Sequence, residues 1–187
     1  MNRRELLGAG LAALVASRRG SARAVDPGLA PAQARREKLL SVAREIMKGA
    51  RYCALITQDS AGRARARAMD AFAPEDDLTV WFGTNPNSRK VKEIQRDPRV
   101  TLYYFDPQAQ GYVTLLGAAR LVDDAAAKKT RWKREWEEFY PDRDKGYLLI
   151  EVRPELIEVV SPKHGVVGSS EAWAPPAVQI DPPAARP

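Results

Sequence analysis

A strand-like run that leads directly into a helix start carries the residues best suited to chemistry. Trp81-Phe-Gly-Thr84 is followed closely by Ser88-Arg-Lys90. At such a junction, the free N–H groups and the dipole of the helix act together with a hydroxyl, a guanidinium and an ammonium group. These donors suit a phosphate monoester dianion, because charged donors make the stronger hydrogen bonds to phosphate. A surface helix carrying solvated basic residues is the alternative that the spacing leaves open.

A second basic group is supplied by the stretch from Arg63 to Met69, which alternates basic and small residues. A period of two predicts a strand with one basic face, and Arg67 on that face is the candidate for the phosphate site. Two cations and several neutral donors suit one phosphate. They are too few for a triphosphate with magnesium, and the chain has no G-x-x-x-x-G-K motif.

Other kinds of chemistry are excluded by composition. The chain has one cysteine, Cys53, and one histidine, His164. A cysteine-based zinc site and a multi-histidine metal site are therefore impossible, so no metal site is predicted. No Ser/His/Asp or Cys/His nucleophilic set can be assembled either. Cys53 lies in an apolar run and is expected to be a small buried hydrophobe.

The elements that must position these residues are mostly short strands with hairpin-sized connections. The pattern predicts a helix over 31–48, strands over 52–57, 63–69, 78–83, 99–105, 112–122 and 147–160, and a short helix over 84–94 capped by Asn85 or Asn87. A second long helix is predicted from Asp123. A parallel sheet would need a crossover helix between successive strands, and most are missing. The order favours a small antiparallel barrel with helices outside.

The two ends of the chain differ from this domain. Residues 1–24 combine Arg3-Arg4, a short uncharged stretch and Ala22-Arg-Ala24, which is typical of a twin-arginine-type signal peptide. A wrongly chosen start codon or a basic disordered tail is the alternative. We expect a linker over 25–31, a domain over 32–168 and a Pro-rich disordered tail over 169–187. The signal predicts a periplasmic or otherwise exported protein, and its uncharged stretch is too short for a stable membrane anchor.

Charge gives no support for nucleic-acid binding. The formal net charge is +6 over 187 residues. Residues 1–24 hold five arginines and one glutamate, a net of +4, which leaves +2 on the remaining 163 residues. That excess is too small to predict a nucleic-acid partner.

A family resemblance covers residues 38 to 160. The motifs that carry it are Arg67-Ala-Met69, Trp81-Phe-Gly-Thr84, Ser88-Arg-Lys90-Val-Lys-Glu-Ile94, Asp97-Pro-Arg-Val100, Tyr103-Tyr104 and Gly117-Ala-Ala119. Their order and spacing resemble the pyridoxamine 5'-phosphate oxidase-like superfamily of FMN-binding split barrels, and within it the general-stress-protein branch. The resemblance implies a mainly β fold with flanking helices, a six-stranded antiparallel split β-barrel. It also implies a homodimer with flavin sites at the interface.

The same resemblance assigns roles to single residues. Arg67 and Lys90 match residues that hold the FMN phosphate, with Ser88 and Arg89 beside them. The backbone of Ala68 and Met69 would lie along the isoalloxazine ring. The Phe82 backbone and the Thr84 hydroxyl would touch the flavin, while Tyr112 stands where the oxidases place a flavin-contacting glutamine.

The resemblance also has limits that shape the expected function. True pyridoxamine 5'-phosphate oxidases end in a basic, substrate-gripping segment, which is absent from 156–165. We therefore expect an FMN-dependent oxidoreductase that acts on an unidentified small-molecule electron donor or acceptor, with no identified catalytic residue. A non-catalytic flavin carrier or stress-response binder, a deazaflavin cofactor, and haem bound through His164 are the alternatives. Trp132, Trp136 and Phe139 could stack on a flavin, but packing against the barrel wall is the favoured interpretation.

Overall fold

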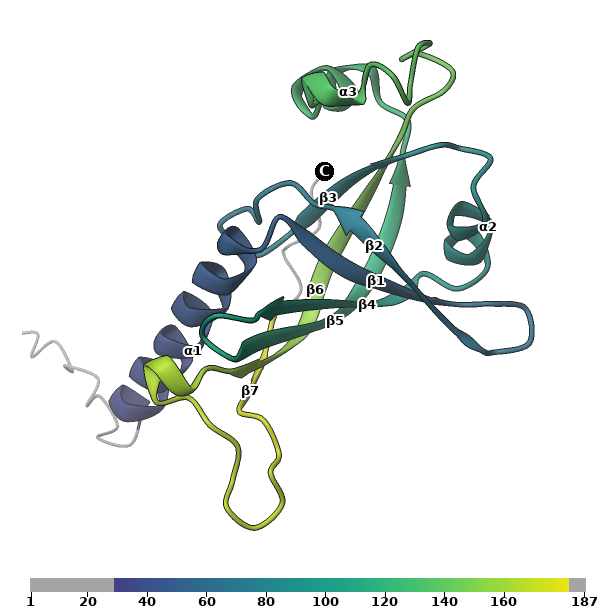
Figure 1. Cartoon of the computed structure of the whole chain (residues 1–187). Helices are drawn as coiled ribbons and strands as arrows, with labels where there is room; N and C mark the ends of the chain where they lie inside the picture. The colour runs from purple at the N-terminus through teal and green to yellow at the C-terminus, as the bar shows by residue number, and fades with distance from the viewer. Residues whose placement is uncertain (1–28, 182–187) are drawn as a thin grey trace, which may run out of the picture.

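The computed structural model describes residues 29–181 as one antiparallel sheet with helices around it (Figure 1). The helices are α1 (Leu29–Gly49), α2 (Arg89–Arg96) and α3 (Ala125–Thr130), with short 3-10 turns at η1 (Arg134–Trp136) and η2 (Pro162–His164). The strands are β1 (Tyr52–Gln58), β2 (Ala64–Asp70), β3 (Val80–Thr84), β4 (Arg99–Asp106), β5 (Gly111–Val122), β6 (Leu148–Val160) and β7 (Ala177–Gln179).

The strand order explains how the sheet closes into a barrel. Neighbouring strands follow the order β2-β1-β4-β5-β6-β3, and β7 pairs with β6. The two ends of this path meet where Ala71 bridges to Phe82 and the Phe72 N–H donates to the Trp81 carbonyl at 2.9 Å. β6 is long enough to pair with β3 along its first half and with β7 along its second. This closure brings the end of β2 beside β3, although a turn separates them in sequence.

Alternating burial along the strands fills the barrel with apolar side chains. Cys53 and Leu55 of β1 point inward, as does Leu102 of β4. α1 covers part of the barrel through residues at helical spacing, among them Val42 and Ile46. α2 lies on another side of the sheet (Figure 1) and buries its Val91 and Ile94.

Most predicted elements are confirmed, with a mainly β antiparallel fold and strand boundaries within two residues. There are seven strands rather than six among the described residues, because β7 adds to the edge of β6. The predicted long helix from Asp123 is wrong. Asp124 caps α3 by accepting from the Ala127 N–H at 2.7 Å, but the helix ends at Thr130. The aromatic residues that follow pack into a tertiary cluster, which outweighs their local helical spacing.

Three smaller expectations also need correction. Ser88, rather than Asn85 or Asn87, is the N-cap residue of α2, because the Asn85 side chain accepts from the Asn87 N–H at 2.8 Å instead. Residues 29–31 of the predicted linker belong to α1. Part of the predicted disordered tail forms β7, since Val178 is buried against the core.

The signal prediction for residues 1–24 lies outside the described part of the chain. Between residues 29 and 181, no helix has the length and apolar character needed to cross a membrane.

Candidate functional site

Polar side chains at the end of β3 and at the start of α2 contact one another. The Lys90 ammonium donates to the Thr84 hydroxyl at 2.9 Å, and the Thr84 and Ser88 hydroxyls lie 3.3 Å apart. Thr84 is 1% exposed, so the contact that fixes Lys90 is partly buried. The predicted collection of donors at this junction is therefore present in the fold.

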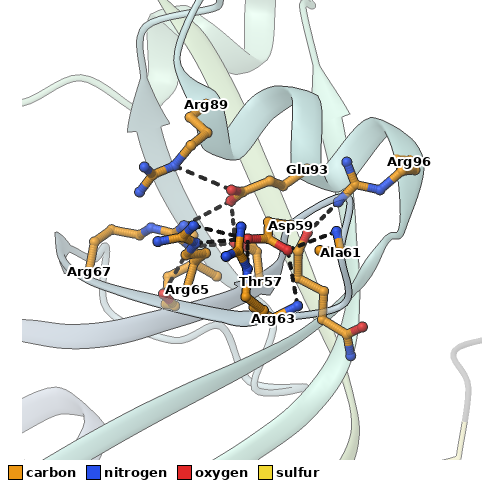
Figure 2. A network of polar contacts seen from close by, with 11 residues as sticks. Thr57, Asp59, Ala61, Arg63, Arg65, Arg67, Arg89, Glu93 and Arg96 are labelled. Carbon is orange, nitrogen blue, oxygen red and sulfur yellow. Dashed lines mark hydrogen bonds and ion pairs between the residues drawn. The ribbon is translucent and has the colours of Figure 1, made fainter.

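Arg67 reaches the same place from β2, within a tight network (Figure 2). One terminal nitrogen donates to the Thr57 hydroxyl at 2.7 Å and to the Leu55 carbonyl at 3.1 Å. The other donates to Glu93 of α2 at 2.9 Å, and the Thr57 hydroxyl donates to the same carboxylate oxygen at 2.5 Å. Arg89 completes the network, with its Nε 3.3 Å from the second oxygen of Glu93. We call Arg67, Ser88, Arg89, Lys90 and Glu93 the phosphate cradle.

The basic row predicted on β2 divides into two parts. Arg63 and Arg65 both donate to Asp59 in the β1–β2 turn, at 2.9 and 3.1 Å (Figure 2). Asp59 also accepts the N–H groups of Ala61 and Arg63, which fixes the turn. Only Arg67, nearer the end of β2, turns toward α2 and joins the phosphate cradle.

Electrostatics in the cradle favour an anion. Three cations, Arg67, Arg89 and Lys90, face one carboxylate, Glu93, which leaves an excess of two positive charges. Burial lowers the pKa of Lys90, and the neighbouring Arg67 and Arg89 charges lower it further, although Glu93 acts in the opposite direction. Burial also lowers the pKa of Arg67. Partly buried cations that crowd one another are stabilised by a bound anion.

A cleft of about 540 Å³ lies beside the cradle, within the range of about 300–1,000 Å³ typical of small-molecule sites. Lys90 is the cradle residue that lines it, whereas Arg67, Ser88, Arg89 and Glu93 are not among its lining residues. Ala68 and Met69 of β2 and Thr84 of β3 line the cleft from the barrel side. Its other lining residues are Arg51, Tyr52, Asp70, Gly83, Asn85, Glu135, Trp136, Phe139 and Tyr140. A larger open hollow of about 800 Å³ lies beside Lys128, Lys129 and Arg143, and it contains none of the predicted site residues.

An aromatic wall, formed by Trp132, Trp136, Tyr140 and Tyr147, bounds the cleft. Its rings meet mostly edge to face, with centroids 5.1–6.3 Å apart. Trp136 and Tyr140 also line the cleft. The favoured prediction of packing is therefore correct for Trp132 and Trp136, and it is wrong for Phe139, which is 72% exposed and lines the cleft. Trp136 and Tyr140 of the wall are also available to a ligand in the cleft.

Asp70, at the end of β2, anchors this wall to the barrel. It accepts from the Lys133 ammonium at 2.7 Å and from the Trp136 indole at 3.2 Å. Burial alone would raise the pKa of Asp70, but the hydrogen bonds and charge of Lys133, with the Trp136 hydrogen bond and the charge of Arg51, hold it below its ordinary value. Sequence reasoning missed both Asp70 and Glu93. The only local signal for Glu93 was its place between Val91 and Ile94 on the buried side of a short helix.

Three other candidates have side chains outside the cleft. Phe82 is fully buried in the barrel core, so only its backbone remains available for the predicted flavin contact. Tyr112 lies on β5 with its ring 5.6 Å from that of Tyr103. His164 has partners at both ring nitrogens: the Ser161 hydroxyl lies 2.8 Å from Nδ1 and the Glu45 carboxylate 3.2 Å from Nε2. A haem iron would have to displace one of them.

Comparison with known proteins identifies relatives of this fold. Residues 38–170 match the family model described as pyridoxamine 5'-phosphate oxidase like. General stress protein 26 of Bacillus subtilis (strain 168) is 30% identical over 104 residues, which cover 54% of this chain and 73% of that protein.

Solved structures share the architecture. A protein related to general stress protein 26 from Clostridium acetobutylicum superposes with a TM-score of 0.64 and 20% identity, over 77% of this chain and 96% of that one. A pyridoxamine 5'-phosphate oxidase-related, FMN-binding protein from Nostoc punctiforme gives a TM-score of 0.55 and 15% identity, over 85% and 99% of the two chains. Because the family model spans most of the chain, this protein belongs to the pyridoxamine 5'-phosphate oxidase-like family.

Proposed function

We propose that this protein binds FMN in the cleft and is an FMN-dependent oxidoreductase. The observation that carries the proposal is the phosphate cradle, whose excess of two positive charges matches a phosphate monoester dianion and whose Lys90 also lines the neighbouring cleft of about 540 Å³. Family membership and the FMN-binding relative from Nostoc support the choice of cofactor. Riboflavin, which lacks the phosphate, would leave the excess of two positive charges in the cradle uncompensated.

Each part of the site has a distinct task in this proposal. Lys90, Ser88 and the first N–H groups of α2 hold the phosphate, together with the Arg67 and Arg89 guanidinium groups. The ring lies along the backbone at Ala68 and Met69. Bound FMN supplies hydride and one-electron chemistry, while the protein positions it and tunes its electronics.

Trp136 and Tyr140 line the cleft and shield part of it from water. Flat aromatic side chains suit that task, because they bury a large area and lose little conformational freedom. We propose a small molecule as the electron donor or acceptor. Pyridoxamine phosphate is not proposed, because the basic segment that would grip it is absent from 156–165.

We propose a homodimer as the working assembly. The outward face of β2, β1, β4 and β5 carries charged residues only near strand ends, at Asp70, Arg99 and Arg120. Its exposed or half-buried side chains between them include Tyr52, Ile56, Tyr103, Phe105, Tyr112 and Leu116. Small alanines of β2 continue this face, and Ala68 and Tyr52 also line the cleft. A second copy of the chain seated on this face would therefore adjoin the flavin and bring Tyr112 close to it. Sedimentation of the purified protein tests this, and a monomer at micromolar concentration would contradict it.

Export through the twin-arginine route is also a proposal. It follows from Arg3-Arg4 and the small-residue site Ala22-Arg-Ala24. This route carries folded proteins, so cofactor loading before export is compatible with it. Cell fractionation with native mass spectrometry reports cleavage, cofactor mass and dimer in one experiment.

The cofactor proposal is tested by visible absorption of the purified protein. We expect a flavin spectrum as isolated or after incubation with excess FMN. A protein that stays colourless after that incubation contradicts the proposal. A Soret band lost in His164→Ala would favour haem instead, and the mass of the released cofactor separates FMN from a deazaflavin. Turnover with a reductant then separates an oxidoreductase from a flavin carrier.

A further inference from the structure

The phosphate cradle contains a buried carboxylate that phosphate binding does not require. Glu93 is 3% exposed, and one of its oxygens accepts from both Thr57 and Arg67. Its other oxygen makes no hydrogen bond within the described structure and lies 3.3 Å from Arg89 Nε. A carboxylate in this position repels a phosphate dianion held by the same arginines, so its presence weakens phosphate binding. Packing gives no reason for the charge, because a neutral side chain of the same shape would fill the same space.

We propose that Glu93 is a specificity-determining residue that sets the charge of the phosphate cradle. This inference rests on the proposed function. With Glu93 the three cations leave an excess of two positive charges, equal to the charge of a phosphate monoester dianion. Without it the excess would be three, and the cradle would attract more highly charged ligands such as pyrophosphate. When the excess charge of the cradle matches one ligand, a more highly charged ligand keeps part of its charge uncompensated and binds less well.

The network offers a substitution that separates charge from shape. Glu93→Gln keeps an oxygen that can accept from Thr57 and Arg67, so the geometry is preserved while one negative charge is removed. Asp59→Asn is the matched control. Asp59 is the other carboxylate of the arginine network, but it binds Arg63 and Arg65 in the β1–β2 turn rather than a cradle residue. Both variants change the net charge of the protein equally.

The experiment measures dissociation constants for FMN and riboflavin with the full-length protein and both variants. The dissociation constant for riboflavin divided by that for FMN isolates the contribution of the phosphate, and a higher ratio means a stronger contribution. For Glu93→Gln we expect this ratio to rise about tenfold, the order of effect of one unit charge in a partly solvated site. In the same variant, pyrophosphate and inorganic phosphate should both compete better with FMN, and the improvement should be larger for pyrophosphate. Asp59→Asn should change the ratio less than about twofold, because Asp59 pairs with Arg63 and Arg65 and makes no ion pair with a cradle cation.

Three results would overturn the proposal. An unchanged ratio in Glu93→Gln would show that the charge is irrelevant, and a lower ratio would show that Glu93 serves to orient Arg67. An equal rise of the ratio in Asp59→Asn would show that the net charge of the protein, rather than Glu93, causes the change. If Glu93→Gln fails to fold, Arg89→Gln replaces it. That variant lowers the excess to one, so the ratio should fall about tenfold, and no fall would reject the proposal.

Failure of the proposed function gives a different result. If the wild-type protein binds neither flavin, calorimetric titration with inorganic phosphate and pyrophosphate still tests Glu93. A gain in pyrophosphate binding by Glu93→Gln over Asp59→Asn supports the charge-setting role, and the absence of a gain contradicts it.

Discussion

Gly83 lies where β3 passes beneath the aromatic wall, and Gly83→Ala tests whether that wall shapes the cleft. A Cβ atom at this position would lie 2.5 Å from Trp136 Cζ3 and 2.5 Å from Tyr147 Cε2. Neither ring can swing away freely, because both belong to the edge-to-face cluster and Tyr147 is almost fully buried. The strand cannot shift easily either, since Gly83 is paired with Leu149 of β6. The added methyl must therefore displace the wall.

The expected cost follows from this overpacking. Extra methyl groups in well-packed interiors cost about 1–3 kcal/mol, and the rigidity of both rings places Gly83→Ala at about 2–3 kcal/mol. For a chain of this size that lowers the melting temperature by roughly 4–12 °C. Urea unfolding measures the loss, and near-ultraviolet circular dichroism reports the displaced tryptophan. FMN affinity should also fall, because Trp136 moves within the cleft.

Gly49→Ala is the matched control. Gly49 ends α1, and nothing lies within 4 Å of the atom that the substitution would add. We expect no loss of stability there, because alanine is favoured over glycine in a helix by up to about 1 kcal/mol. If Gly83→Ala were as stable as the wild type, with an unchanged near-ultraviolet spectrum, the described packing of the wall would be wrong.

Three further predictions concern single side chains. Lys90→Gln should weaken FMN binding at least about tenfold and leave riboflavin binding unchanged in fluorescence titrations, because one charged phosphate contact is lost; equal loss for both ligands would contradict this role. Asp70→Asn should destabilise the fold by about 1–2 kcal/mol at neutral pH. Because the Asp70 pKa lies below 3.8 in the fold, the stability it adds is complete above that pH and is lost as the pH falls through the folded pKa. The two unfolding curves should therefore converge in acid, and a constant difference down to the lowest pH would refute the ion pair. Burial raises the pKa of the Cys53 thiol to about 12, so it should not react with a thiol reagent at pH 8 unless denaturant is present; rapid reaction of the native protein would contradict its burial.

The sequence was sufficient for the parts of the site that depend on local pattern. Alternation along β2 predicted a basic row that contains Arg67, and the strand-to-helix junction predicted donors at Ser88, Arg89 and Lys90. The family resemblance then singled out Arg67 within the row and added Thr84. These residues come together because neighbouring elements place them, so periodicity and turn signals carry the information. The fold class was predictable for the same reason, since each strand has its own alternating pattern.

Contacts between residues far apart in the sequence could not be predicted from local patterns. Asp70 meets Lys133 across 63 positions of sequence, and nothing local distinguishes either residue from a solvated surface charge. The segment after Asp123 carries aromatic residues at helical spacing, yet contacts with β3 and β6 override the helix. The start of β7 lies in a proline-containing stretch whose composition suggested disorder, but pairing with β6 and burial of Val178 stabilise it.

A crystal structure of the protein grown with FMN tests the central claim most directly. We expect phosphate density within hydrogen-bonding distance of Lys90 and Ser88, with the ring in the cleft beside Met69 and Trp136. Phosphate density in the open hollow beside Lys128 and Arg143, with the cradle holding only solvent, would contradict it.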